Sequence, residues 1–382
     1  MSTNYLITKG VSNKMMTASS NHEFPEKSES NKKPGALVSI KIVKSLCIGL
    51  ALIIGLLFVS CRKSNLRPAS VTPTVYVAGA EYNSSGVYVA TLWKDGVATH
   101  LSTQNSGALS VYVNGSDVYV AGNQHINNVG IPTLWKNGVA TNLTDGSYGA
   151  AAFSVYVNGT DVYVAGVVYV NNGSTPTVWK NGVATNLTDD GTIGGVAYSV
   201  YVNGADVYAA GYDGNDTSSF ATVWKNGVAS HLNDGTHVAE ATSVYVNGAD
   251  VYVTGFQTSE TGSTAKLWKN GIATDLSSAI YGNSAMSVYV CGADVYVAGE
   301  EINSNGFNVA KLWKNGVPTN LSDGTRDEYA ISVYVNGSDV YVAGGEVDLS
   351  SGNTTVKVWK NGVATNLTDG TRPAAVFSVF VK

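Results

Sequence analysis

Short apolar stretches alternate with Gly- and Asn-rich turns along most of the chain, and together they form one unit that recurs. A clear copy reads Ser-Val-Tyr-Val-Asn-Gly-Ser-Asp-Val-Tyr-Val-Ala-Gly over 110–122, followed by Leu-Trp-Lys-Asn-Gly-Val-Ala-Thr-Asn-Leu over 134–143. Val, Tyr, Thr and Trp favour a pleated, packed surface, so each copy predicts four short strands. Apolar residues occur on both faces of a strand, with Val111 and Val113 on one and Tyr112 on the other. Each small sheet should therefore be covered on both sides by its neighbours.

One tryptophan marks every copy of the unit, and the spacing between tryptophans gives its period. Successive tryptophans are 42 to 46 residues apart. A fixed period of roughly 40–50 residues with strand-like repeats is typical of a β-propeller. We therefore predict an all-β fold over 75–382, a seven-bladed propeller with four antiparallel strands in each blade. The marking residues are Trp93, Trp135, Trp179, Trp224, Trp268, Trp313 and Trp359.

The two ends of the repeat array predict how the ring closes. The first repeat begins at 74–79 with a second strand that has no first strand before it. The chain ends at 378–381 with a first strand, Ser-Val-Phe-Val, that has no second strand after it. We expect strand 378–381 to complete blade one, which would remove two exposed sheet edges.

The Val-Tyr-Val-Ala-Gly repeats resemble bacterial β-propeller repeat families that occur in exported proteins. The resemblance covers 75–382 and implies the propeller fold, but it implies no catalytic residue because the repeated positions of those families are scaffold. The Trp-Asp ending of WD40 repeats, the double Gly of kelch repeats and the full Asp-box are all absent.

The segment before the repeats has the features of an export leader, which we assign to 1–60. Lys41 and Lys44 precede fourteen apolar residues at 46–59, which is too short for a transmembrane helix but suits a signal-peptide core. Phe-Val-Ser-Cys at 58–61 is similar to a bacterial lipobox. We therefore expect Cys61 to carry lipid, palmitate included, and 61–74 to tether the propeller to a membrane of the bacterial cell envelope. The expected location is the outer membrane, on its periplasmic or its surface side. The alternative is an uncleaved anchor with an incidental Cys61. The segment before the apolar core is long, which also leaves open a start at Met15, at Met16 or at a non-Met codon nearer Gly35.

Charge and cysteine content narrow the classes of partner. The whole chain carries a net charge of −5, and 1–60 holds seven Lys and three Glu, so the remainder carries −9. An acidic domain argues against nucleic acid, because such binders need a basic surface. Cys291 is the one cysteine of the repeats, where other copies have Asn, so we expect no disulfide framework. We also expect the protein to be a monomer.

Antiparallel strands place the connections of every blade on two opposite faces of the ring. The turn face carries the Asn-Gly turns between strands one and two and between strands three and four, which are nearly the same in every blade. The variable face carries the connections between strands two and three and the links between blades, including 123–131, 212–221 and 300–310. Loops on a rigid scaffold are where binding residues concentrate, so we expect any ligand on the variable face.

The candidate ligand-binding residues lie on the links of the variable face, and they are Arg, His, acidic and Tyr side chains that can donate, accept and stack. Solvated loops would give the same composition. The candidates are Tyr148, His237, Glu240, Tyr281, Arg326, Asp327, Glu328 and Arg372.

Two further repeated features have a structural and a functional interpretation. On the turn face, an Asp at the start of the second strand and a Lys at the end of the third should pair within a blade, or else form a repeated ligand-binding ring. On the variable face, Asp-Gly pairs at 145–146, 234–235, 323–324 and 369–370 are turn formers that could also contribute to calcium sites. We assign no other cofactor and no metal ligand.

The sequence leaves the function open between three classes. No nucleophile elbow, phosphate loop or metal-binding His pair occurs, so we assign no catalytic residue. The favoured interpretation is a lipid-anchored, non-enzymatic binding or scaffold module for a glycan or protein. The alternatives are a polysaccharide lyase or glycoside hydrolase with its site at the channel mouth of the variable face, and a purely structural role.

Overall fold

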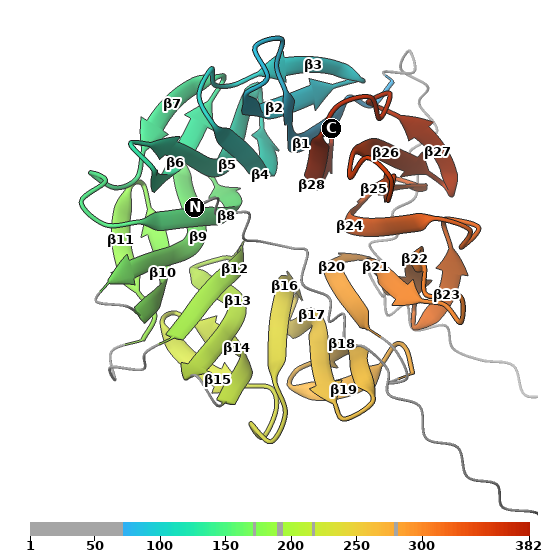
Figure 1. Ribbon diagram of the computed structural model, residues 1–382. Coiled ribbons are helices and arrows are strands. Elements are labelled where there is room, and N and C mark those ends of the chain that lie inside the picture. The colour runs from blue at the N-terminus through green and yellow to red at the C-terminus, as the bar shows by residue number, and fades with distance from the viewer. Residues whose placement is uncertain (1–71, 171–172, 189–193, 216–217, 279–281) are drawn as a thin grey trace, which may run out of the picture. The chain divides into compact units, whose positions relative to one another are not determined.

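The protein is a seven-bladed β-propeller in which every described element is a strand (Figure 1). The computed structural model describes residues 72–170, 173–188, 194–215, 218–278 and 282–382. Among them there is no helix long and apolar enough to cross a membrane. The leader and Cys61 lie outside the described residues, so lipidation stays a prediction.

Each blade has four strand positions, counted from the axis outward, and blade one comes first in each series. The first strands, nearest the axis, are β28 (Ala374–Val381), β4 (Ser106–Asn114), β8 (Ala150–Asn158), β12 (Gly194–Asn203), β16 (Ala239–Asn247), β20 (Asn283–Cys291) and β24 (Asp327–Asn336). The second are β1 (Val75–Tyr82), β5 (Asp117–Ile126), β9 (Asp161–Val170), β13 (Asp206–Asn215), β17 (Asp250–Ser259), β21 (Asp294–Ile302) and β25 (Asp339–Val347). The third are β2 (Tyr88–Lys94), β6 (Val129–Lys136), β10 (Gly173–Lys180), β14 (Ser218–Lys225), β18 (Gly262–Lys269), β22 (Asn308–Lys314) and β26 (Thr354–Lys360). The fourth, at the outer edge, are β3 (Val97–His100), β7 (Val139–Asn142), β11 (Val183–Asn186), β15 (Val228–His231), β19 (Ile272–Asp275), β23 (Val317–Asn320) and β27 (Val363–Asn366).

The predicted ring closure is confirmed. Strand β28 pairs antiparallel with β1, and Figure 1 shows the last strand beside the first. The pairing is extended by backbone hydrogen bonds in both directions between Thr74 and Lys382, at 2.7 and 2.9 Å. Strand β28 starts at Ala374, four residues before the predicted 378–381, because the inner strand continues through a bulge.

That bulge recurs in every blade and explains the Gly of the repeated Val-Tyr-Val-Ala-Gly. In blade five, Ala241 pairs with Gly255 and Ser243 with Thr254, so Thr242 is the extra residue. A Cβ on Gly255 would lie 1.9 Å from the carbonyl oxygen of Glu240, which is too close for two non-bonded atoms. The close approach of two backbones at the bulge therefore requires Gly.

Tryptophans hold neighbouring blades together. All seven are at most 1 % exposed. Trp93 of blade one, for example, packs with Tyr341 and Val358 of blade seven. Fully burying a large apolar side chain contributes about 1.5–3 kcal/mol, so the seven interfaces supply much of the stability of the ring.

A serine on each first strand joins it to the first strand of the next blade. Its hydroxyl accepts the backbone N–H of a valine at 3.1–3.3 Å, and the bond from Val379 to Ser332 joins blade seven back to blade one. Each inner strand has an unpaired edge toward the axis, and the serine satisfies one of its donors. The accepting residues are Ser110, Ser154, Ser199, Ser243, Ser287, Ser332 and Ser378.

Two residues after each serine, an aromatic ring faces the axis, and the seven rings form a closed belt. Neighbouring ring centroids are 4.7–5.1 Å apart with interplanar angles of 46–55°. Burial raises the pKa of the belt tyrosines, and contact with neighbouring hydroxyls contributes. The belt consists of Tyr112, Tyr156, Tyr201, Tyr245, Tyr289, Tyr334 and Phe380.

The connections on the variable face are shorter than the sequence suggested. Residues 123–131, expected as an irregular loop, mostly continue β5 and β6, and only Asn127 and Asn128 form the turn, both with positive φ. Alternating side chains here still pair across two strands, so the hairpin extends to its tip. The variable face is therefore built from rigid hairpin ends and the links between blades.

Candidate functional site

The turn face carries the same ion pair in six blades. Lys136 approaches Asp117 at 2.9 Å, and the five equivalent pairs lie at 2.7–2.9 Å. Each lysine also lies over the ring of a tyrosine, 5.2 Å from the centroid in the case of Lys136 and Tyr119. The predicted Asp–Lys pairing is confirmed, and exposed pairs of this kind contribute about 0–1 kcal/mol each.

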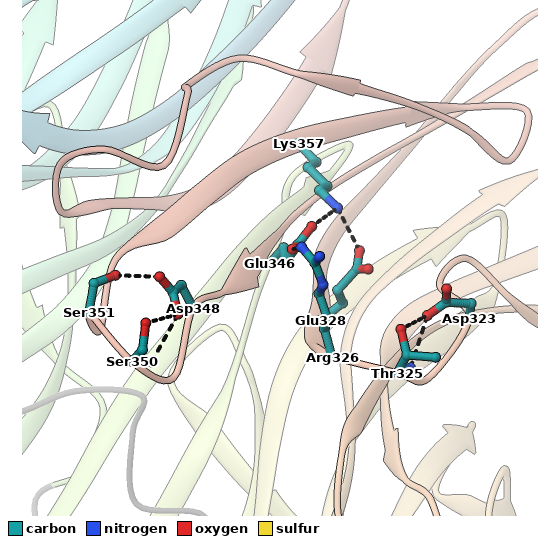
Figure 2. Close-up of polar contacts among 9 residues, drawn as sticks. All are labelled: Asp323, Thr325, Arg326, Glu328, Glu346, Asp348, Ser350, Ser351 and Lys357. Atoms are coloured by element: carbon teal, nitrogen blue, oxygen red, sulfur yellow. Dashed lines mark hydrogen bonds and ion pairs between the residues drawn. The ribbon is translucent and has the colours of Figure 1, made fainter.

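On the variable face, four charged side chains of blade seven form what we call the charged cluster: Arg326, Glu328, Glu346 and Lys357 (Figure 2). The ammonium of Lys357 lies 2.6 Å from Glu346 and 3.0 Å from Glu328, and Arg326 pairs with the other oxygen of Glu346. Glu328 and Glu346 are direct cross-strand partners, so two carboxylates face each other and Lys357 bridges them.

The pKa shifts in the charged cluster follow from this geometry. Hydrogen bonds from Lys357 lower the pKa of Glu346, whereas burial raises the pKa of Glu328 despite the same lysine. Burial by itself would lower the pKa of Lys357, but the two glutamates raise it overall. Each cation of the cluster is paired with a glutamate of the same cluster, so these charges contact one another within blade seven as well as solvent.

Asp327 belongs to a different contact from its two neighbours in sequence. Its carboxylate accepts the backbone N–H of Asn308 in blade six at 2.8 Å. Its charge also acts on Glu300 of blade six, whose pKa is raised to about 7, mainly by burial and secondly by Asp327. Burial, with the charge of Glu300 second, raises the pKa of nearby Tyr329 to about 12.

A second group on the variable face lies across blades three to five, and we call it the tyrosine–glutamate cluster: Phe153, Tyr169, Tyr198, Tyr212 and Glu240. The ring of Tyr198 is 5.4 Å from that of Phe153 and 6.0 Å from that of Tyr212. Tyr169 is 44 % exposed, and the other four are partly exposed. Burial raises the pKa of Glu240, although its contact with the Tyr198 hydroxyl acts in the opposite direction. Aromatic rings and one carboxyl group thus lie together on the variable face.

The structure separates the predicted site residues into these two clusters and several isolated positions. Arg326 and Glu328 meet in the charged cluster, and Glu240 belongs to the tyrosine–glutamate cluster. Tyr148, 56 % exposed, adjoins Gly149, whose carbonyl accepts the N–H of Tyr169. The other candidates are His237, which is exposed and contacts the hydroxyl of its neighbour Thr236 at 3.0 Å, Arg372, which is exposed on the last link, and Tyr281, which lies outside the described residues.

The four Asp-Gly links are turns that use their own carboxylates. Asp145 accepts from the N–H and the hydroxyl of Ser147, and Asp234, Asp323 and Asp369 accept in the same way from a threonine two residues on. Over the described residues, no group of three or more His, Cys, Asp or Glu side chains is placed to hold a metal ion. The arrangement is therefore that of Asx turns.

Sequence reasoning missed Lys357, Glu346 and the aromatic partners of Glu240, although a signal was present. The third strands of the first four blades carry Thr91, Thr133, Thr177 and Thr222 before the residue that precedes Trp, whereas the last three carry Lys266, Lys311 and Lys357. Each of these lysines pairs with an acid of its own blade, namely Asp275, Glu301 and Glu346. A comparison of equivalent strand positions between repeats, in addition to the loops, would have identified these three lysines.

The comparisons with known proteins support the fold alone. No family model and no curated protein matches the sequence. Among solved structures, the chain is similar to a Mycobacterium tuberculosis puromycin-hydrolyzing peptidase, with 11 % identity, a TM-score of 0.52, and coverage of 77 % of this chain and 51 % of that one. It is also similar to a puromycin hydrolase, with 10 % identity, a TM-score of 0.53, and coverage of 79 % and 53 %. The chain spans about half the length of each of these structures.

Proposed function

We propose that the protein is a non-enzymatic binding module that recognises a glycan with the tyrosine–glutamate cluster of its variable face. The observation that carries this proposal is the grouping of Phe153 and Tyr212 with Tyr198, whose hydroxyl contacts the carboxyl of Glu240. Aromatic faces can stack on the C–H faces of a sugar, while carboxyl and phenol groups bond its hydroxyls. A protein ligand is the other partner that such a surface could bind.

The test is a screen of the full-length protein against glycan and peptide arrays, followed by variants of both faces. Tyr169→Ala removes an exposed ring of the cluster and should weaken glycan binding about tenfold, or 1.4 kcal/mol. Val139→Ala, at a site 70 % exposed on the turn face, is the matched control and should change nothing. A ligand whose affinity falls in Val139→Ala but is unchanged in Tyr169→Ala contradicts the proposal.

The alternative is a polysaccharide lyase or glycoside hydrolase with its site at the mouth of the channel. One observation favours it: Glu300 has a pKa of about 7 beside Asp327, as a general acid at neutral pH requires. The similar structures are hydrolases by name, which is compatible with this alternative but extends to the fold only. Turnover of a bound glycan that is lost in Glu300→Gln, with binding retained, would favour the enzyme.

The proposed location is the bacterial cell envelope, with the propeller held by lipid on Cys61. Support comes from the apolar core at 46–59 and the lipobox-like residues that follow it. Replacing Cys61 by Ser should release the protein from the membrane fraction or leave an unprocessed precursor, as fractionation and mass measurement would detect. Unchanged partitioning and mass in that variant would contradict lipidation.

A further inference from the structure

We infer that the tyrosine–glutamate cluster selects glycans that carry a free, protonated amine, such as those built from glucosamine, over their neutral or N-acetylated counterparts. This inference rests on the proposed function and adds the charge class of the ligand.

The first argument is the position of Glu240 among the rings. Glu240 pairs with Phe256 and Tyr245 of the belt pairs with Tyr252. Because the bulge at Thr242 lies between them, the side chains of Glu240 and Tyr245 lie on the same side of β16. Glu240 therefore points to the channel side of the ring, at the end nearer the variable face. Tyr198 reaches it from the first strand of the preceding blade, and Phe153 contacts Tyr198 from the blade before that. Two rings from consecutive first strands, Phe153 on β8 and Tyr198 on β12, thus lead to the carboxyl on the next first strand, β16.

The second argument is the distribution of basic residues. In the described residues of blades one to four, the lysines Lys94, Lys136, Lys180 and Lys225 end the third strands at the turn face, and Lys382 lies near the same face. The remaining cations of the variable side belong to blades five to seven and their links, and four of these five are paired with acids: Lys266, Lys311, Arg326, Lys357 and Arg372. Among the described residues, no basic side chain contributes to the pKa shift of Glu240. A cation from a ligand would therefore meet a carboxyl that no cation of the protein neutralises.

The third argument concerns the chemistry of that contact. A protonated amine interacts favourably with aromatic faces as well as with a carboxylate, and both gain strength where water is partly excluded. The groups that act on the Glu240 carboxyl or on its cluster partners are the phenols of Tyr198, Tyr212 and Tyr169 and the hydroxyl of Ser174, all of which stay neutral at ordinary pH. Burial raises the pKa of Glu240, and an ammonium group beside the carboxyl would lower it, so the fraction of protonated Glu240 should fall on binding. Binding should therefore release a proton, whereas a neutral sugar should not.

The experiment compares two oligosaccharides of equal length that differ only at nitrogen, a glucosamine hexamer and an N-acetylglucosamine hexamer. Titration calorimetry with the full-length protein, at a pH where the amines are protonated, should give at least about tenfold tighter binding of the glucosamine hexamer. Its heat should vary with the ionisation enthalpy of the buffer, because a proton is released.

Two variants, each of which replaces one glutamate by glutamine, distinguish binding at this site from nonspecific attraction of a cation to an acidic protein. Glu240→Gln should reduce the preference for the amine to within about twofold and remove the buffer dependence. Glu260→Gln, at an exposed acid on the hairpin tip of the same blade, should preserve both. Tyr198→Phe, which keeps the ring, controls for loss of packing, and thermal melting verifies that each variant is folded.

The outcomes distinguish this inference from the proposed function. Equal binding of both hexamers, or loss of the preference in Glu260→Gln as large as in Glu240→Gln, overturns the inference and leaves glycan binding in place. Binding of neither hexamer, nor of any other glycan, by the folded protein overturns both. Binding of a lysine-rich peptide in place of the glucosamine hexamer also overturns the glycan assignment.

Discussion

At the scale of single residues, the charges that matter most are those that the folded ring partly desolvates. Charged side chains at the turn face stay hydrated and form isolated pairs, whereas Lys357 and Glu328 are each 8 % exposed. The same interaction type therefore has different weight in the two places. Substitutions of single charged residues should reveal this difference in the free energy of unfolding.

Replacing Lys357 by Ala should lower the free energy of unfolding by about 3 kcal/mol, the lower end of the range for removing one partner from a buried ion pair. The loss would leave Glu328 and Glu346 as direct cross-strand neighbours of like charge. Lys136→Ala on the turn face, which breaks an exposed pair, should cost much less, because solvent screens the pair. Denaturant titration of both variants measures the difference, and equal losses would contradict this account.

The Glu300 carboxyl should make stability depend on pH. Its pKa in the folded protein is about 7 against an ordinary 4.5, so the folded state holds a proton that the unfolded state has lost between these values. Stability contributed by this group is complete below its ordinary pKa and falls as pH rises through about 7. Glu300→Gln should consequently be about as stable as the parent below the ordinary pKa of 4.5 and more stable above pH 7, by up to about 3 kcal/mol at 1.36 kcal/mol per pKa unit. Melting curves across that interval would contradict the prediction if the variant gained nothing at alkaline pH.

At the scale of elements, most of what forms the blades could be predicted from the sequence. The strands, the Asn-Gly turns and the place of 378–381 follow from local propensity and from counting repeats. The bulge did not, because Leu109 and Thr242 look like ordinary strand residues and the extra position arises only from pairing with Gly122 and Gly255. The members of the two clusters could be predicted in part: Arg326, Glu328 and Glu240 were named from the sequence, and their role in binding stays a prediction. The rings beside Glu240 come from other blades, and spacing along one chain cannot reveal such contacts.

Removing the last strand tests the element on which closure depends. Deleting 374–382 would expose β1 along its whole length and remove Val376, Val379 and Val381 from the core between blades seven and one. At about 1.5–3 kcal/mol for each fully buried side chain, the loss is comparable to the whole stability of an ordinary domain. We expect aggregation or a large fall in melting temperature. A truncated protein that melts with the parent would show that β28 is dispensable.

At the scale of the whole molecule, the ring is held closed by one non-covalent strand pair that joins the two ends of the array. Joining Lys382 to Thr74 by a short linker and opening the chain in the link 143–149 would build every blade from one continuous segment. The ends are already hydrogen-bonded, so the linker would strain nothing. Such a permutant should fold with the same far-ultraviolet spectrum but melt several degrees lower, because no strand then crosses the junction between the terminal blades. Equal melting temperatures would mean that the tryptophan interfaces alone close the ring.

The position of that strand pair also determines from which side of the ring the chain leaves toward residues 62–74. Val75 pairs with Val381, at the end of β1 that meets the turn face, so Thr74 leaves the ring on that side. The thirteen residues 62–74 could extend at most about 45 Å at 3.3–3.6 Å per residue. If lipid on Cys61 holds residues 62–74 to a bilayer, the turn face would be the side of the ring nearer to the headgroups. The variable face would then be directed away from the bilayer, toward ligands in the surrounding solution.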